Sequence, residues 1–195
     1  KRQLINRANE NAKIMELKAK FVEGDAEFLP YSENEFDIVL SQYGHMFAPR
    51  PSIVVKELAR VLKPGGILAF STWPKELFMG KFFKLIESFS QPLPPEVASP
   101  VLWGDMAVIE DRLRDHFDHI EFARDTMFAP TMSPAHMLKL FEKNAGPLAN
   151  LVKALADEPT KLSNLRNAAQ VLIEKFFSNN FLRQDFLMTR CIKKV

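Results

Sequence analysis

Hydrophobic and polar positions follow one another along the chain in blocks that predict alternating helices and strands. Residues 1–18 are mostly polar, with apolar residues at helical spacing, and predict an amphipathic helix. Short apolar runs at 19–22 and 36–41 predict two strands, the second of the buried type. Residues 52–62 return to helical spacing, and Ser52 is expected to cap this helix.

The sequence KPGG at 63–66 separates this helix from a further apolar run at 67–72. Glycine supplies the positive φ that a helix exit needs, and proline cannot continue a helix. Strand, helix, glycine turn and strand form a βαβ unit, so the two strands are expected to be parallel with a right-handed crossover. The predicted fold class is therefore α/β, with helices covering the sheet.

The second half of the chain is predicted to be richer in helix. Helices are expected at 80–90, at 106–116, from Ser133–Pro134 to a stop at Gly146–Pro147, at 148–156 and at 161–177. A proline-rich loop follows the first of these helices, and strands are expected at 119–128 and 186–192. No internal repeat or low-complexity segment interrupts this pattern.

Composition and charge narrow the classes of function. Hydrophobic residues make up 47% and charged residues 26% of the 195 residues, and the net charge is +2. With no arginine-rich stripe, a nucleic-acid partner is not expected, and the basic stretch 1–20 is interpreted as a solvated helix face. The single cysteine, Cys191, excludes a disulfide framework and a CxxC metal site and favours a cytoplasmic location. No apolar run approaches the ~20 residues of a membrane span, and no signal peptide is visible.

Small and polar residues follow the predicted strands. In open α/β sheets ligands bind beyond the carboxyl ends of the strands, which places Asp25–Ala26, Ser41–His45 and Thr72–Trp73 on one rim. An aspartate carboxylate accepts from an adenine amine, and a neighbouring backbone N–H donates to a ring nitrogen. Asp25 fits equally well as a plain turn residue after Gly24, so spacing alone leaves both interpretations open.

Two stretches carry a family resemblance: GDAEFLPYSENEFDIVLSQYGHMF at 24–47 and ELARVLKPGGILAFSTWP at 57–74. Together they resemble the middle of a class I S-adenosylmethionine-dependent methyltransferase of the ubiquinone/menaquinone-biosynthesis type (methyltransferase type 11). The similarity is strongest over 21–74, and the later WGD and AGPL sequences extend it over nearly the whole chain. It implies a Rossmann-like, mostly parallel sheet with a final antiparallel strand. The implied reaction transfers a methyl group from S-adenosylmethionine to oxygen, carbon or nitrogen of a small, apolar or aromatic acceptor.

Site residues follow from the resemblance by position. It implies that the cofactor contacts Gly24, Asp25, Ala26, Ser41, Gln42 and Tyr43. Asp25 would accept from the adenine amine, the Ala26 amide would contact the ring, and Ser41 and Gln42 would lie beside the methionine part and the methyl group. His45 is the best-placed candidate for a catalytic base, although simple packing near Pro49 is the plainer interpretation. Asp37, His116, His119 and His136 are interpreted as structural, and no metal site is expected.

One part of the family pattern has no counterpart in the sequence. The family has a glycine-rich loop after its first strand and an acidic residue at the end of its second, and both are expected upstream of Lys1. Of the family's sheet order 3-2-1-4-5-7-6, the chain would then supply strands 3 to 7, without strands 1 and 2. Either upstream residues cover the open strand edge or another chain does, as in a homodimer.

A single methyltransferase domain, incomplete at its N-terminus, is expected over 1–195. It would comprise a cofactor-side βαβ part (1–74), helical substrate-lid inserts with one strand (75–185) and a final strand (186–195). The lid would draw on Phe78, Phe82, Phe83, Trp103, Met106, Met127, Phe128, Met132, Met137 and Phe141, most of them core residues. The alternative function is a catalytically silent, methyltransferase-like binding or partner protein. A nicotinamide-dependent reductase is disfavoured, because the sequence has no Tyr-x-x-x-Lys pair.

Overall fold

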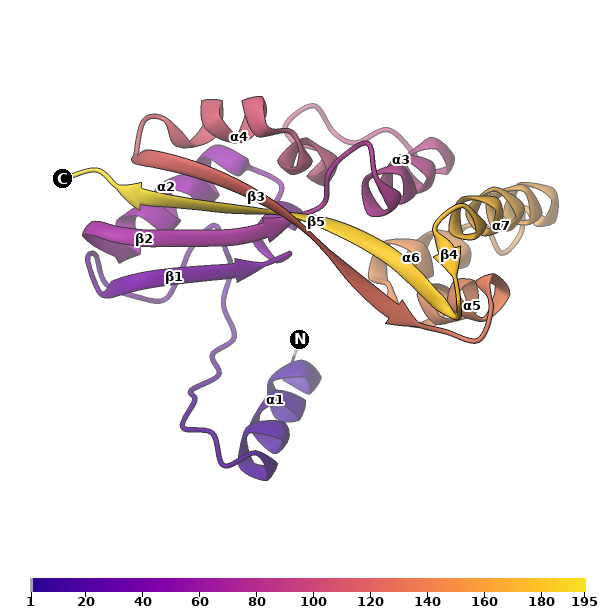
Figure 1. The fold of residues 1–195 in the computed structure, drawn as a ribbon, viewed down its shortest axis with the longest axis horizontal. Helices are drawn as coiled ribbons and strands as arrows, with labels where there is room; N and C mark the ends of the chain where they lie inside the picture. The colour runs from indigo at the N-terminus through magenta and orange to yellow at the C-terminus, as the bar shows by residue number, and fades with distance from the viewer. Residues whose placement is uncertain (1) are drawn as a thin grey trace.

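One twisted sheet forms the centre of the protein, whose residues 2–195 are described by a computed structural model (Figure 1). Its strands are β1 (Phe36–Gln42), β2 (Leu62–Thr72), β3 (Phe117–Pro130) and β5 (Phe181–Lys193), and the short β4 (Phe177–Ser178) pairs with β5. The order is β1-β2-β5-β3, with β1 and β2 parallel and β5 antiparallel to both of its neighbours. The expected α/β class and the antiparallel final strand are confirmed, and the order matches the 4-5-7-6 part of the family sheet.

Seven helices of residues 2–195 accompany the sheet. They are α1 (Arg2–Ile14), α2 (Pro51–Val61), α3 (Phe78–Phe89), α4 (Met106–Leu113), α5 (Pro134–Asn144), α6 (Gly146–Ala154) and α7 (Pro159–Glu174). Short 3-10 turns, η1 (His45–Phe47) and η2 (Pro100–Gly104), lie between them. Helix α2 contacts β2, α3 contacts β5 and α4 contacts β3. Helices α5, α6 and α7 lie beyond the end of the sheet toward which β1 and β2 point (Figure 1).

The sheet has one covered and one open face. Leu68 and Phe70 of β2 are buried in the main core with side chains of α2, α3 and α4. On β1, however, Ile38 is 55% and Leu40 75% exposed. The prediction of a buried-type strand at 36–41 is wrong in this respect, because within residues 2–195 these side chains face solvent and β1 is an edge strand. The predicted parallel βαβ unit itself is confirmed by the pairing of β1 with β2.

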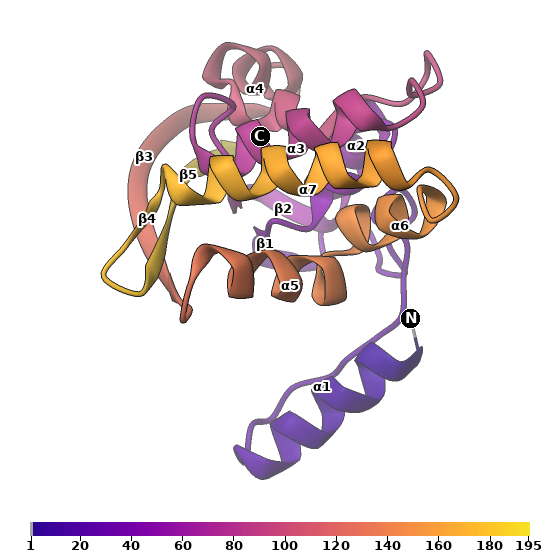
Figure 2. The same cartoon turned by 90° about the vertical axis from the view of Figure 1, so that its right-hand side faces the viewer.

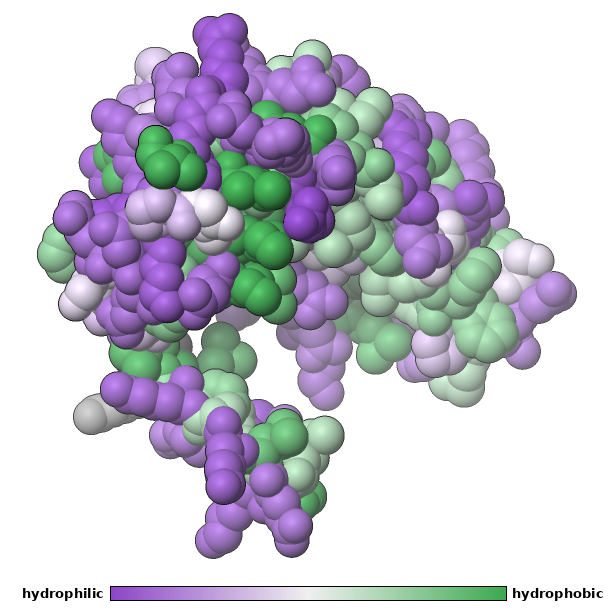
Figure 3. Space-filling view, turned by 60° about the vertical axis from the view of Figure 1, so that its left-hand side comes forward, coloured by the Kyte–Doolittle hydropathy of each residue, from purple (hydrophilic) through white to green (hydrophobic). Residues whose placement is uncertain are grey.

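The segment between α1 and β1 departs from the prediction. Residues 17–24 form no helix or strand, and only an isolated bridge joins Asp25 to Phe28. A strand exists only where its backbone groups bond to a neighbour, and within residues 2–195 none lies beside 19–22. The predicted strand there is therefore absent. The predicted N-terminal helix forms as α1 but ends at Ile14 and not at residue 18, and Lys1 lies outside the described residues. It stands as a separate lobe (Figures 2 and 3).

Proline positions decide several helix boundaries. The predicted cap at Ser52 is wrong, because α2 already begins at Pro51 and Arg50 is its N-cap. Similarly, Gly146–Pro147 begin α6 and do not close the preceding helix. Proline favours the first turn of a helix, where its fixed φ fits and its missing N–H is not needed. The predicted Ser133 cap of α5 is confirmed: its side chain accepts from the His136 N–H at 3.1 Å.

Candidate functional site

The acidic turn at residues 24–28 is held against the start of α2. Asp25 Oδ1 accepts a hydrogen bond from the Glu27 N–H at 2.9 Å, which closes an Asx turn. The side chain of Glu27 is buried, accepts from the Arg50 backbone N–H at 2.7 Å and forms an ion pair with the Arg50 guanidinium. The position of Asp25 is therefore set by the ion pair between the buried Glu27 carboxylate and the exposed side chain of Arg50, the N-cap of α2.

A second pair of charges fixes the rest of this segment. The Leu29 N–H donates to Glu57 Oε2 at 2.8 Å, and the Arg60 guanidinium donates to the carbonyl oxygens of Tyr31 (2.7 Å) and Leu29 (3.0 Å). Glu57 and Arg60, three residues apart on α2, also pair with each other at 2.7 Å, which lowers the pKa of Glu57. Sequence reasoning missed this clamp, although the Glu–Arg spacing on a predicted helix is a weak sign of such a pair.

The turn after β1 is built around a buried histidine. His45 Nδ1 lies 2.9 Å from Ser41 Oγ, and the His45 N–H donates to the same oxygen at 3.2 Å. His45 is 4% exposed and lies between the rings of Phe70 and Trp103, with centroids 4.5 and 4.4 Å away. Burial first, and then the charge of Arg112, lower the pKa of His45 to about 4. Its imidazole is therefore neutral at pH 7, and its contacts orient Ser41.

A strained tyrosine lies between Ser41 and His45. Tyr43 has a φ of 53°, a left-handed conformation that costs a non-glycine residue roughly 1–2 kcal/mol. Its ring stacks on Trp73 at a centroid distance of 4.0 Å and an interplanar angle of 3°, and its hydroxyl lies 3.9 Å from the Met127 sulfur. Backbone strain of this kind gathers at functional sites. Tyr43 and Trp73 thus form an aromatic pair at the carboxyl ends of β1 and β2.

Gly80 and Gly104 allow close backbone packing against residues 73–75. A Cβ on Gly104 would lie 1.9 Å from the Trp73 carbonyl oxygen, and one on Gly80 would lie 2.3 Å from the Pro74 carbonyl oxygen. Neither position tolerates a side chain without movement of the backbone. Asp105, which follows Gly104, pairs with Lys75 and also caps α4 by accepting from the Ala107 N–H at 3.1 Å. The WGD sequence therefore fixes the loop that carries Trp73.

A cavity of about 400 Å³ lies along β1 and reaches Ala26. Ala26, Ser41, Gly44 and His45 line it, together with apolar side chains of β1 and α2 and of residues 29–31. The structure thus brings Ala26 and Ser41 to one space, whereas Gly24, Asp25, Gln42 and Tyr43 are not part of its lining. In residues 2–195 no group hydrogen-bonds to the second carboxylate oxygen of Asp25 or to the Ala26 N–H.

Other polar groups considered in the sequence have ordinary surroundings. Asp37 pairs with Lys63 at 2.8 Å, which lowers the pKa of Asp37, and His136 Nδ1 accepts from the Met132 N–H at 3.3 Å. Within residues 2–195, no three histidine, cysteine, aspartate or glutamate side chains lie close enough together to hold a metal ion. In the same residues, no helix combines the length and the apolar character needed to cross a membrane.

Comparison with known proteins gives the family. Residues 1–70 match a family model described as a methyltransferase domain. The chain is also 30% identical over 187 residues to an uncharacterized protein of Mycobacterium tuberculosis, which covers 95% of this chain and 68% of that protein. The chain belongs to the class I S-adenosylmethionine-dependent methyltransferases. The cofactor of this methyltransferase is S-adenosylmethionine, and its reaction is methyl transfer.

Further matches agree with this assignment. Over 77 residues, the methyltransferase is 35% identical to the ubiquinone/menaquinone biosynthesis C-methyltransferase of Azotobacter vinelandii, covering 38% of this chain and 30% of that protein. An S-adenosylmethionine-dependent methyltransferase of Thermotoga maritima shares the fold with a TM-score of 0.51 at 19% identity, over 94% of this chain and 69% of that one. The YcgJ protein of Bacillus subtilis also shares the fold, with a TM-score of 0.55 at 18% identity. This match covers 100% of this chain and 80% of YcgJ.

Proposed function

We propose that this methyltransferase acts on a small, apolar or aromatic acceptor and binds its cofactor between the turn at Asp25–Ala26 and the end of β1. One observation supports this more than any other: Ala26 and Ser41, which belong to segments separated in sequence, line the same cavity. Clefts at the carboxyl ends of parallel strands are the common ligand sites of open α/β sheets.

The adenine end of the cofactor fits the acidic turn. We propose that the free carboxylate oxygen of Asp25 accepts from the adenine amine and that the Ala26 N–H donates to a ring nitrogen, with Gly24 shaping the turn. Ser41 and Gln42 would then lie beside the methionine part and the methyl group, and Tyr43 would border the acceptor. In residues 2–195 no glycine-rich loop follows a strand, so these residues account for only one side of a cofactor site.

Positioning is proposed as the main source of catalysis. S-adenosylmethionine supplies an electrophilic methyl group whose leaving group is a neutral thioether. Orienting the two reactants can then provide up to roughly 7–11 kcal/mol, so a catalytic pair of side chains is not required. The base predicted at His45 stays a prediction, and its burial and lowered pKa support a positioning role through Ser41 more than proton abstraction.

Calorimetric titration of the full chain with S-adenosylhomocysteine tests the cofactor site. Asp25→Asn keeps an oxygen for the Glu27 N–H but replaces the free carboxylate oxygen with an amide, and it is expected to weaken binding about tenfold. Asp37→Asn is the matched control, because Asp37 lies at the opposite end of β1 and pairs only with Lys63 on the surface. Equal affinities for the two variants would contradict the adenine assignment.

The acceptor class is tested separately, by the release of S-adenosylhomocysteine with a panel of quinols, phenols and amines. Turnover only with carboxylate, phosphate or macromolecular acceptors would contradict the proposed class. His45→Ala, assayed with an acceptor from this panel, tests the histidine: unchanged turnover would rule out a base at this position.

We further propose a cytoplasmic location, since the one cysteine has no partner for a disulfide, and no nucleic-acid partner, since the net charge is +2. A homodimer through the open edge of β1 is testable by light scattering.

A further inference from the structure

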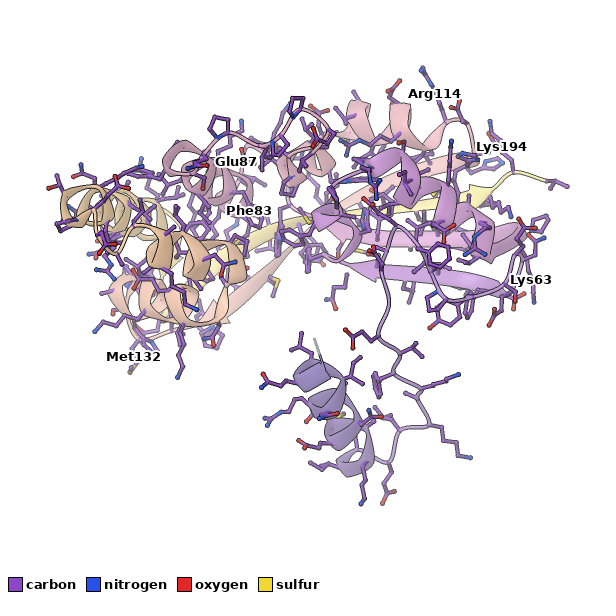
Figure 4. All side chains as sticks on the ribbon, turned by 180° about the vertical axis from the view of Figure 1, so that it is seen from behind. Lys63, Phe83, Glu87, Arg114, Met132 and Lys194 are labelled. Atoms are coloured by element: carbon purple, nitrogen blue, oxygen red, sulfur yellow. The ribbon has the colours of Figure 1, made fainter. Side chains whose placement is uncertain are left out.

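A second cavity, of about 410 Å³, lies on the outer side of α3. Phe47 of η1 and Phe83 and Ile86 of α3 line it, and the loop that follows α3 and the start of α6 complete it. Figure 4 shows Phe83 and Glu87 on α3, near the end of the sheet toward which β1 and β2 point. The volume falls in the range of about 300–1,000 Å³ that is usual for small-molecule sites.

The wall of this cavity is mostly apolar and aromatic. The rings of Phe47 and Phe83 meet edge to face at 5.7 Å. Three prolines, Pro92, Pro100 and Pro147, also belong to the lining and contribute no N–H groups. Such a wall suits the body of an apolar or aromatic molecule and offers few hydrogen-bond donors to it.

The polar groups of the lining favour a cation. Glu87 is the only charged residue among those that line the cavity. Its Oε1 accepts from the Ser99 hydroxyl, which holds the carboxylate in place, while no group in residues 2–195 bonds to Oε2. The nearby Ser90 hydroxyl already donates to the Ile86 carbonyl oxygen at 2.8 Å. The cavity thus combines an apolar wall, a fixed carboxylate and no basic side chain.

We propose that this cavity binds an apolar amine, with its hydrocarbon body against Phe47 and Phe83 and its ammonium group on Glu87. The inference rests on the proposed function, because it names the class of the acceptor: amphipathic amines, and not carboxylates or phosphates. Glu87 is then a specificity-determining residue, and no sequence pattern pointed to it.

An NMR titration of the full chain at pH 7 with two probes of equal size tests the proposal. Phenethylamine carries an ammonium group, and 2-phenylethanol carries a neutral hydroxyl on the same skeleton. The amine is expected to bind about two to five times more tightly, the ratio typical of one partly exposed ion pair. Glu87→Gln should abolish that preference, whereas Glu96→Gln, in the loop that follows α3 but exposed and outside the lining, should keep it.

A second variant keeps the test valid if Glu87→Gln folds poorly. Leu93 is 47% exposed at the cavity, so Leu93→Arg is tolerated and places a positive charge there. It should weaken phenethylamine binding and spare 2-phenylethanol. Equal binding of the two probes to the unmodified protein, or an amine preference that survives both variants, would overturn the proposal. The titration with S-adenosylhomocysteine separates this outcome from a failure of the methyltransferase assignment, since it reports on the cofactor alone.

Discussion

Gly104→Ala is the most direct test of the packing that holds the aromatic pair Tyr43–Trp73. The added Cβ would lie 1.9 Å from the Trp73 carbonyl oxygen and 2.8 Å from the Lys75 nitrogen. Both neighbours are backbone atoms, so a rotamer change cannot relieve the overlap. The loop that carries Trp73 has to move by more than 1 Å to reach an ordinary contact of roughly 3.2 Å between carbon and oxygen.

The expected loss of unfolding free energy is about 2–3 kcal/mol, the upper part of the range for overpacked sites. For a chain of this size that corresponds to a fall in Tm of roughly 4–12 °C. Gly146→Ala is the matched control, because nothing lies within 4 Å of its added Cβ, and it should leave Tm unchanged or slightly higher. Urea unfolding gives the free energies, and near-ultraviolet circular dichroism reports the Tyr43–Trp73 stack. Equal midpoints and equal aromatic spectra for the two variants would refute the argument.

Three further changes test other parts of the structure. The pKa of His45 is about 4 in the folded protein and 6.5 in the unfolded chain, so the unfolded chain binds a proton more readily and acid favours unfolding. The free energy of unfolding should therefore fall between pH 6.5 and 4, by about 2 kcal/mol at pH 5. His45→Gln should flatten this pH dependence in urea titrations. Glu27→Gln breaks the ion pair with Arg50, so it should lower the free energy of unfolding by about 1–2 kcal/mol and weaken S-adenosylhomocysteine binding. An unchanged calorimetric affinity would contradict a role of the turn at residues 24–28 in cofactor binding. Burial raises the pKa of Cys191 to about 12, so iodoacetamide at pH 8 should modify it only after unfolding, and rapid labelling of the folded protein by mass spectrometry would show otherwise.

Local patterns predicted most of the elements correctly. The βαβ unit follows from two apolar runs around a helix, although KPGG lies within β2 and the helix already ends at Val61; these signals act over a few residues. Boundaries were less certain, because a proline beside a serine can begin a helix at either residue, as Pro51 and Ser52 illustrate. The strand expected at 19–22 failed for a different reason. Its residues suit a strand, but pairing depends on a neighbour that no local pattern supplies.

The candidate site divides in the same way. Ala26 and Ser41, which line one cavity, could be chosen from the sequence as residues near the ends of two predicted strands, although the strand predicted at 19–22 does not form. The burial of His45, by contrast, depends on the distant rings of Phe70 and Trp103. No spacing near His45 indicates that environment, and it is burial that lowers its pKa and makes proton abstraction a poor role for it.

The sequence by itself determined the class of fold and the family resemblance, because both depend on the order and periodicity of nearby residues. Only the tertiary structure decided which groups meet across long separations. It brought Gly104 under Trp73, paired Glu27 with Arg50 and left one face of β1 open. The physical reason is that pKa values, close packing and cavities depend on three-dimensional neighbours, and the chain order alone does not specify these.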